Sequence, residues 1–530
     1  MLNGYGETDM CERKPIDYHD PAWFSRGITM IDCDPDWAVK VLFGDLSSPE
    51  AVLASADAYF ESMLTDSRVT DMAFAVFQQT SFVEASGMDW IYRKLARLKE
   101  DAKLSYTGRW VYLMERIPAL YRALEKFGLD WAEIAVEGCR KRGVRPWIYF
   151  RMNDLHAVDD DASLFHDPFF YEAKGKGYLN GNPAYGHPLG TSGSVENLYD
   201  FSHPEVREWL LSYLEEIILR YDAFGYELDF MRNIYCFDYL RSEAGYEAYM
   251  TDFIRRVKGI VQRAEARHGH PVKLAVRLGQ SVAHNLVYGF DVKTWVAEGL
   301  VDMLIPSCEE VCNSGVDVRG WRETIGEDVA LAVGFDDHVI RWLVHEATPL
   351  YAMREDHVKA LAARYFNLGA NGIYFNNYYS PDKPAKDMNA ETVLRGRRTL
   401  VVTHQDIVPL GQEGYNPLPM PVQGASLTLN IGRVRSHEPL SITVGYDIED
   451  TENVTVELNG APYVSKEALP LRPDRVEGHY YSKDWQFRRA ASLVRYDFSG
   501  IDLHGDFAVT AKGQGGRIVY LDVSVQADGD

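Results

Sequence analysis

The chain has 530 residues, of which 46% are hydrophobic and 25% charged, and it carries a formal net charge of −23. This length predicts more than one domain, and the composition is typical of a soluble globular protein. The negative charge argues against a nucleic-acid partner, because proteins that bind phosphate backbones present basic patches to them.

The cysteines and the N-terminus restrict the class of protein further. The six cysteines form no CxxC pair, and Cys308 and Cys312 lack a second pair, so neither a zinc site nor a disulfide scaffold is expected. The first twenty residues are polar and acidic, and no run of eighteen apolar residues occurs. We therefore expect a cytoplasmic protein with no membrane partner, no metal and no cofactor; homo-oligomerisation is left open.

A loose N-terminal tail is expected over residues 1–22, after which strand-like and helix-like segments alternate. Eight such units predict an α/β fold, a (β/α)8 TIM barrel over residues 23–408. The predicted strands are Gly27–Asp34, Thr70–Phe77, Val144–Asn153, Phe224–Arg232, Val272–Ser281, Leu300–Cys308, Val329–Asp336 and Asn371–Tyr378.

Between the strands, apolar residues at a spacing of three and four predict amphipathic helices. The clearest are Pro204–Tyr221, Ser242–His268 and Arg354–Leu368, and a last helix near Glu391–Val402 is expected to close the barrel. Two connections are long, 78–126 and 155–203. The second is rich in Gly, Pro, Asn and Tyr, which favours a substrate-binding loop.

The composition changes near Pro409. Residues 409–421 are rich in Pro and Gly and are expected to form a linker. Beyond them, short alternating runs separated by turn residues predict an all-β sandwich or jelly-roll domain over residues 422–530. We expect this domain to serve a structural or oligomerisation role.

The segment YDAFGYELDFMR, residues 221–232, carries two acids in an apolar strand. Residues two apart on a strand share a face, so Glu227 and Asp229 project together while Tyr226, Leu228 and Phe230 pack on the other side. Buried acids are costly unless something pairs or uses them. The alternatives are a structural ion pair with an arginine of a neighbouring strand and a catalytic centre.

In a TIM barrel the active site lies at the C-terminal ends of the strands. Polar residues occur at seven of these ends, and together they suit a neutral ligand rich in hydroxyl groups. Each of them alone is equally well explained as a helix cap or a turn residue. The candidates are Asp32, Asp34, Arg151, Asn153, Asp154, His156, Glu227, Asp229, Arg277, Glu309, Glu310, Asp336, Asp337, His338, Asn376, Asn377 and Tyr378.

Glycoside hydrolysis requires two carboxyl groups, about 5 Å apart for retention and about 6.5–9.5 Å apart for inversion. Glu227 and Asp229 approach a substrate from the same side, so one of them should act with a carboxylate across the barrel. We prefer Asp229 as nucleophile or base, held ionised by Arg277, and Glu309 as acid. Glu227 as acid with Asp336 opposite stays open. Expected substrate-binding residues are Asp34, Arg151, Asn153, His156, Arg277, Glu310, Asp336, Asn376 and Tyr378.

Three segments, 146–156 (PWIYFRMNDLH), 197–232 (ending YELDFMR) and 289–307 (GFDVKTWVAEGLVDMLIPS), resemble the family-10-like glycosyl hydrolase barrels. The resemblance covers most of residues 25–405 and implies a trailing β-sandwich and a sugar substrate. Phe224 stands where that family has an acidic residue. An Asp ending strand four is also similar to the nucleophile of α-amylase-like and α-galactosidase-like barrels, and a strand-four Glu to the acid/base of the cellulase-like clan. The resemblance leaves both roles open.

Two other functions compete with glycoside hydrolysis. A metal-dependent barrel hydrolase or isomerase would favour His-x-His at strand one, where this chain has aspartates; His268-Gly-His270 lies at the opposite barrel face and is interpreted as a solvated turn. A carbohydrate-binding barrel without catalysis is the second alternative. The sequence has no P-loop, dinucleotide fingerprint or GxSxG elbow, which disfavours kinases, dehydrogenases and serine hydrolases.

Overall fold

The fold of the chain is given by a computed structural model. It describes residues 14–25, 27–34, 44–78, 119–154, 168–180, 197–231, 233–238, 245–307, 315–335, 338–340, 351–352, 354–378, 387–402, 417–470 and 490–527.

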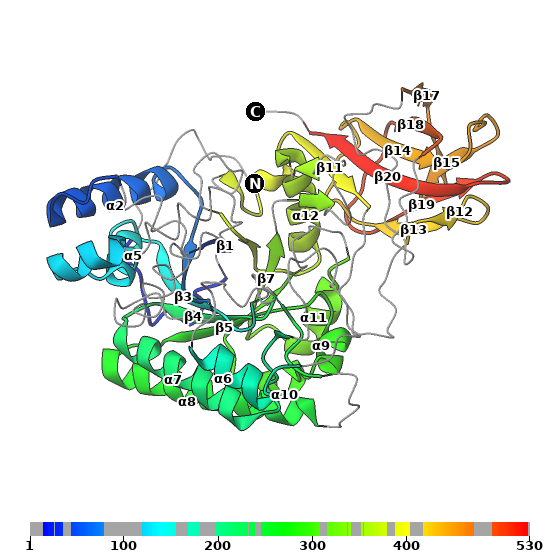
Figure 1. Ribbon diagram of the computed structural model, residues 1–530. Helices are drawn as coiled ribbons and strands as arrows, with labels where there is room; N and C mark the ends of the chain where they lie inside the picture. Colours follow the sequence, from blue (N-terminus) through cyan, green and yellow to red (C-terminus); the bar gives the residue numbers. More distant parts are fainter. Residues whose placement is uncertain are drawn as a thin grey trace, which may run out of the picture.

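Parallel strands form a closed barrel in the order β1-β10-β7-β6-β5-β4-β3-β2 (Figure 1). Each of the eight predicted strands overlaps one of them, so the predicted TIM barrel is confirmed. The strands are β1 Ile28–Cys33, β2 Asp71–Gln78, β3 Arg145–Arg151, β4 Gly225–Asp229, β5 Lys273–Leu278, β6 Met303–Pro306, β7 Ala330–Phe335 and β10 Gly372–Phe375.

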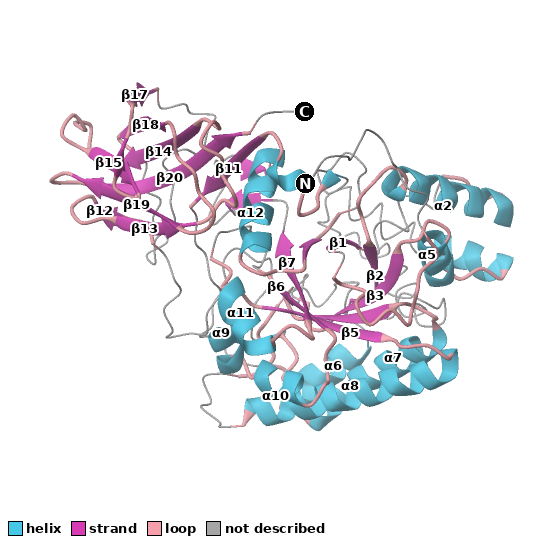
Figure 2. Cartoon of the chain, turned by 180° about the vertical axis from the view of Figure 1, so that it is seen from behind, coloured by secondary structure: helices cyan, strands magenta, loops and turns pink. Residues whose placement is uncertain are grey.

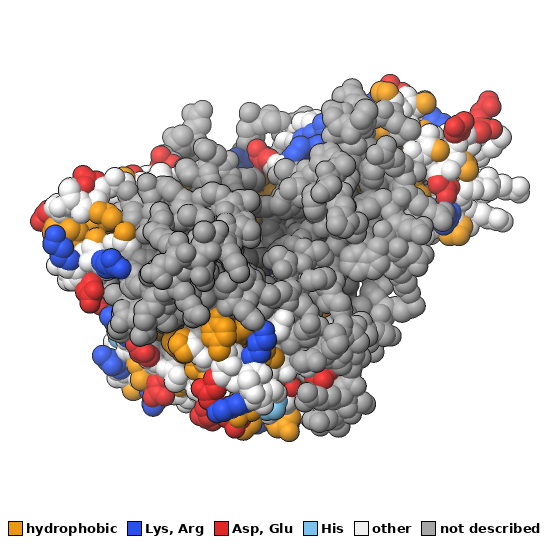
Figure 3. All heavy atoms as spheres, viewed as in Figure 1, with side chains coloured by type: hydrophobic (Ala, Val, Ile, Leu, Met, Phe, Trp, Pro, Cys, Tyr) orange, Lys and Arg blue, Asp and Glu red, His pale blue; other side chains and the backbone are white. Residues whose placement is uncertain are grey.

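Helices surround the barrel (Figure 2). The three clearest predictions correspond to α7, α8 and α12, although residues 242–244 lie outside the described residues. On the surface, α7 and α8 are linked by half-exposed ion pairs such as Glu208–Arg256, and both signs of charge are interspersed there (Figure 3). The helices are α2 Pro49–Leu64, α5 Trp131–Arg140, α6 Pro168–Lys176, α7 Pro204–Arg220, α8 Tyr246–His268, α9 Val282–Val287, α10 Val292–Ala297, α11 Val318–Ile325 and α12 Glu355–Asn367.

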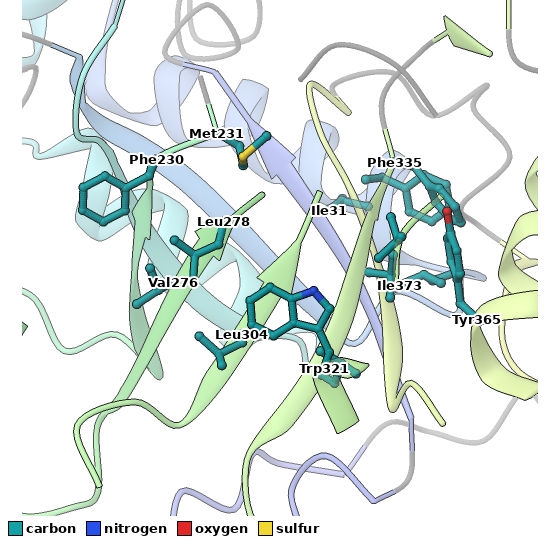
Figure 4. Packing of buried hydrophobic residues seen from close by; sticks show 14 of the residues in the cluster. Ile31, Phe230, Met231, Val276, Leu278, Leu304, Trp321, Phe335, Tyr365 and Ile373 are labelled. Carbon is teal, nitrogen blue, oxygen red and sulfur yellow. The ribbon is translucent and has the colours of Figure 1, made fainter. Parts of the chain in front are cut away.

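The alternation of each strand divides its apolar residues between two clusters. The outward set packs between the strands and the helices, where Trp321 of α11 and Tyr365 of α12 reach the sheet (Figure 4). The inward set fills the barrel with alanines, methionines and a few large rings, including Trp147 and Tyr374. Small residues face large ones, as at Gly225, where an added Cβ would lie 2.3 Å from the Trp147 ring.

Aromatic residues close the N-terminal end of the barrel. Trp23, from the segment that precedes β1, packs with Trp147 and Phe224. Tyr18 packs on Phe224 and on His270, so the expectation of a loose tail is wrong for the part of it that begins at residue 14.

The interpretation of His268-Gly-His270 as a solvated turn is also wrong. The His270 ring is largely buried, and its Nε2 lies 2.6 Å from Asp222 Oδ1. The two histidines therefore belong to the packed N-terminal end of the barrel.

The C-terminal region is all-β, as predicted, and consists of two antiparallel sheets. One has the order β11-β20-β14-β18-β17, with β12 paired to β20, and the other has the order β13-β19-β15-β16. Their strands are β11 Arg397–Val401, β12 Met420–Pro421, β13 Ser426–Leu429, β14 Leu440–Tyr446, β15 Thr455–Leu458, β16 Ala461–Pro462, β17 Ser465–Leu469, β18 Ser492–Phe498, β19 Phe507–Lys512 and β20 Arg517–Gln526.

The closing helix predicted near Glu391–Val402 is wrong. A 3₁₀ turn, Thr392–Leu394, is followed by β11, which pairs antiparallel with β20. Buried Arg398 donates to the carbonyl groups of Ile431 and Arg433, so long-range contacts override the helical pattern. Residues 403–416 lie outside the described residues, so the limit at 408 remains a prediction, whereas Met420–Pro421 at the predicted end of the linker pairs with β20.

We predict that Gly225→Ala destabilises the protein by about 1–3 kcal/mol, because the new methyl group would overlap the Trp147 ring in a filled barrel. Urea unfolding followed by fluorescence measures the change. The matched control is Gly259→Ala in α8, where an added Cβ meets nothing within 4 Å; it should be neutral or stabilise by up to about 1 kcal/mol. Equal effects of the two variants would contradict the packing argument.

Candidate active site

The register of three neighbouring strands arranges the inward side chains of the barrel in two levels. Asp229 of β4 is paired with Arg151 of β3 and with Arg277 of β5, which forms the upper level at the C-terminal ends. One pleat below, Glu227 is paired with Tyr149 and Ala275. The prediction that both acids share one face and that Arg277 lies beside Asp229 is confirmed.

Strand β4 is fixed from its outer side. Tyr226 points away from the barrel and is fully buried. Its hydroxyl donates to the carbonyl of Tyr221 at 2.6 Å, where α7 ends. Helix α7 thereby sets the position of the strand, and the alternation turns Glu227 and Asp229 inward.

Asp229 is held as one half of a buried ion pair. Its Oδ2 lies 3.3 Å from Arg277 Nη1, and its Oδ1 accepts from the Met231 amide at 2.8 Å. Arg277 also donates to Asn376 Oδ1 at 2.8 Å and to Ser307 Oγ at 3.1 Å. Burial opposes the charge on Arg277, yet Asp229 and the other acids around it hold the pKa of Arg277 above its ordinary value.

Beneath this pair, Tyr374 connects two acids across the barrel. Its hydroxyl, on β10, lies 2.8 Å from Asp32 Oδ2 and 3.0 Å from Glu227 Oε1. Asp32 Oδ1 accepts from the Asn377 amide. Burial raises the pKa of Asp32 to about 7. Burial, followed by the charges of Asp229 and Asp32, raises the pKa of Glu227 well above its ordinary value.

A third group surrounds Asp34, just after β1. The Tyr149 hydroxyl donates to Asp34 Oδ1 at 2.8 Å, and the Arg151 guanidinium pairs with the same oxygen. Arg151 also donates to Asn377 Oδ1 at 3.2 Å. The Asp34 side chain is 20% exposed, whereas that of Arg151 is 1% exposed. Asn377 adopts φ 55, in the left-handed region that Asn enters more readily than most residues.

The predicted site residues fall into three sets. Those brought together at the upper barrel are Asp34, Arg151, Glu227, Asp229, Arg277 and Asn376. His156, Glu309, Glu310 and Asp336 lie outside the described residues, as do Asp337 and the side chain of His338. The remaining two, Asn153 and Tyr378, have other roles.

Asn153 and Tyr378 are corrections to the predicted site. The fully buried Asn153 amide donates to the carbonyl groups of Tyr199 and Tyr235 and accepts from the Tyr199 amide, so it joins two loops. Tyr378 belongs to the outer apolar cluster, with its ring 5.8 Å from that of Phe375. Both residues follow the last inward position of their strand, where alternation no longer determines direction.

Sequence reasoning missed three members of the network and undervalued two others. Tyr149 lies two residues before Arg151, and Tyr374 lies two residues before Asn376. Because residues two apart on a strand share a face, this spacing indicated that both tyrosines point into the barrel. It was overlooked because a tyrosine within an apolar strand is typical of core. Ser307 was passed over, whereas Asp32 and Asn377 were candidates that were left out of the expected substrate-binding residues.

The residues that the structure describes contain no group of three or more His, Cys, Asp and Glu side chains that could hold a metal ion. Nor does any helix among them have the length and apolar character needed to cross a membrane.

No protein-family model and no curated protein matches the sequence, so the family-10-like resemblance remains an expectation. Several solved structures are similar in fold. The glycoside hydrolase domain of PgaB (BpsB) from Bordetella bronchiseptica aligns with 12% identity and a TM-score of 0.35, over 65% of this chain and 92% of that one. Endo-glycoceramidase II from Rhodococcus sp. aligns with 12% identity and a TM-score of 0.33, over 95% and 98%.

The GH36 alpha-galactosidase AgaA from Geobacillus stearothermophilus aligns with 9% identity and a TM-score of 0.33. The alignment covers 95% of this chain but only 56% of that one. At these TM-scores the likenesses support no inference about chemistry, which has to come from the residues of this chain.

We predict that Asp32 makes folding stability depend on pH. Because the pKa of Asp32 is about 7 in the folded protein and its ordinary value is 3.8, the folded state retains a proton that the unfolded state releases between these values. The contribution of Asp32 to the unfolding free energy should fall by about 1.4 kcal/mol per pH unit across this window and level off above about pH 7.

Urea unfolding from about pH 5 to about pH 8 measures this dependence. The difference between wild type and Asp32→Asn should change with pH across the window, whereas exposed Asp328→Asn, the matched control, should follow the wild type. Parallel curves for wild type and Asp32→Asn would contradict the prediction.

Proposed function

We propose that the chain is a glycoside hydrolase that cleaves a glycosidic bond in a small glycoside or oligosaccharide, with Asp229 as nucleophile or base. The observation that carries this proposal is that two acids on one strand have different surroundings. Asp229 is paired with Arg277, while Glu227 lies against Tyr374 and Asp32. Carboxyl groups in contrasting environments are how a single site supplies different protonation states.

The position and composition of the network agree with this chemistry. Asp229, Arg277 and Asn376 lie at the C-terminal ends of their strands, where TIM barrels carry their active sites. Asp34, partly exposed beside Arg151, offers a carboxylate to a hydroxyl group of the ligand. Carboxylates and amides of this kind hydrogen-bond sugar hydroxyls without requiring a charged substrate.

The second carboxyl group of the mechanism is assigned to Glu309, on the segment after β6. Strand β6 is separated from β4 by β5, so Glu309 follows a different strand from Asp229. Glu227 shares the strand of Asp229 and lies one pleat lower, so it is better suited to tuning the neighbouring acid or binding a hydroxyl than to donating a proton from the opposite side. Asp336, after β7, is the alternative donor, in the arrangement that makes Glu227 the acid.

We predict that Asp229→Asn lowers the rate of hydrolysis by about a thousandfold or more, because an amide is neither a nucleophile nor a base at this position. Wild type is first screened with aryl glycosides and disaccharides, and the released anomer is followed by NMR. The matched control is Asp222→Asn, which removes a carboxylate at the opposite end of the same strand region.

Asp222→Asn should retain hydrolysis, because its carboxylate pairs with His270 far from the upper level. A wild-type protein that binds sugars and hydrolyses none of them would refute the enzyme proposal and favour the carbohydrate-binding alternative. Equal activity of wild type and Asp229→Asn would refute the assignment of Asp229.

A further inference from the structure

The Tyr374 hydroxyl has more acid partners than it has hydrogens. It lies within hydrogen-bond distance of Asp32 Oδ2 and of Glu227 Oε1, and it can donate one proton to one of them. The second contact is a hydrogen bond only if the other acid is protonated and donates to the phenolic oxygen. For both contacts to be hydrogen bonds, one of the two acids must therefore be protonated in addition to the Tyr374 hydroxyl.

The surroundings indicate which acid carries that proton. Asp32 Oδ1 accepts from the Asn377 amide, so both oxygens of Asp32 serve as acceptors if Tyr374 donates to Oδ2. Glu227 Oε2 is buried and has no hydrogen-bond partner among the residues that the structure describes. An unpartnered oxygen is less costly on a neutral carboxyl group than on a buried carboxylate.

We propose that Asp32 and Tyr374 are positioning residues that hold a proton on Glu227 directly beneath Asp229. The hydrogen bonds run from Glu227 Oε1–H to Tyr374 Oη, and from Tyr374 Oη–H to Asp32 Oδ2. Proton movement along this chain breaks the Glu227 Oε1–H bond as a new Tyr374 Oη–H bond forms, and breaks the original Tyr374 Oη–H bond as an Asp32 Oδ2–H bond forms. It needs no outside reactant. As far as it concerns Asp229, the proposal rests on the proposed function.

Protonation of Glu227 affects the ion pair between Asp229 and Arg277. Arg277 is the guanidinium that pairs with Asp229, and its Cζ also lies 5.2 Å from the Tyr374 ring centroid. An ionised Glu227 would compete for Arg277 and repel Asp229 along the same strand. A neutral Glu227 leaves the ion pair intact and places the negative charge on the acid at the upper level.

The groups that face Glu227 come from every strand packed near it. They are Tyr149 and Arg151 of β3, Asp229 of β4, Arg277 of β5, Tyr374 of β10, and Asp32 with Asp34 at the end of β1. Arg277 favours ionisation of Glu227, whereas burial, Asp229 and Asp32 oppose it. Replacing Asp32 by Asn removes one opposing charge and places an amide N–H toward Tyr374, which turns the Tyr374 hydrogen toward Glu227.

Difference infrared spectroscopy of the full-length protein tests the proposal, because it detects the carbonyl stretch of a protonated carboxyl group. Wild type at about pH 8, where Asp32 with its pKa of about 7 is ionised, should show this band, and Glu227→Gln should lose it. In Asp32→Asn the band should disappear at a pH lower than in wild type by about one unit or more. A band absent from wild type, or lost in Asp32→Asn and kept in Glu227→Gln, would overturn the proposal.

Tyr374→Phe provides a second test if Glu227→Gln fails to fold. It removes the hydroxyl group that favours the charged form of Asp32, so the Asp32 titration should move to higher pH and the band at about pH 7 should grow. The matched control is Tyr149→Phe, whose hydroxyl contacts Asp34 instead and whose loss should leave this band unchanged. Identical spectra for wild type and Tyr374→Phe at every pH would contradict the hydrogen-bond chain.

The two proposals fail separately, because the infrared measurement needs no substrate. A Glu227 band in a protein that hydrolyses no glycoside would refute the proposed function and leave the protonated Glu227 standing. Hydrolysis that depends on Asp229, in a protein without the band, would refute the protonated Glu227 and support the proposed function. In an active protein, Asp32→Asn/Glu227→Gln should be more active than Asp32→Asn alone, because Gln cannot acquire the second charge.

Discussion

The buried ion pair between Asp229 and Arg277 is the interaction on which the upper barrel depends. Removing both charges from water is costly, and the attraction between them offsets this cost only when the remaining hydrogen-bonding groups also find partners. Arg277 meets that condition by donating to Ser307 of the segment after β6 and to Asn376 after β10, while Asp229 accepts from the Met231 amide. One guanidinium thus links β4, β5 and the ends of β6 and β10.

The pair also requires space that a distant residue provides. An added Cβ at Gly334 of β7 would lie 1.8 Å from Ser307 Oγ, so only glycine leaves Ser307 in place. Ser307 in turn accepts from Arg277 Nε. The position of the Asp229 carboxylate therefore depends on the absence of a side chain at Gly334.

The sequence was sufficient to predict the features governed by strand periodicity. The eight strands, the shared face of Glu227 and Asp229 and the inward direction of Arg277 all follow from alternation, which a buried parallel strand maintains along its length. Features set by three-dimensional partners were not predictable in this way. From the sequence, Tyr374 is interpreted as a core residue, because its contact with Glu227 across the barrel cannot be foreseen. Asn153 is interpreted as a site residue, because the two loop carbonyl groups to which it donates cannot be foreseen either.

The error at residues 391–402 has the same origin. The segment RGRRTLVV permits either a helix or a strand locally, and the choice is made by β20, which lies more than a hundred residues later in the chain. Arg398 shows the physical reason: its guanidinium is buried, and the carbonyl groups that accept from its two Nη atoms belong to the C-terminal region. Local pattern cannot supply such partners.

The two ends of the barrel differ in how they neutralise buried charge. At the N-terminal end, Asp71 pairs with Arg145 and accepts from Trp147 Nε1, so each acid has its own base and aromatic rings cover it. At the C-terminal end, carboxyl groups outnumber guanidinium groups among the described residues, and Asp32 and Glu227 share a tyrosine hydroxyl in place of a cation. A surplus of acids adds nothing to stability, because each uncompensated charge destabilises the fold. The proton that we propose on Glu227 would relieve this surplus, and for this reason we assign the proposed chemistry to the C-terminal end of the barrel.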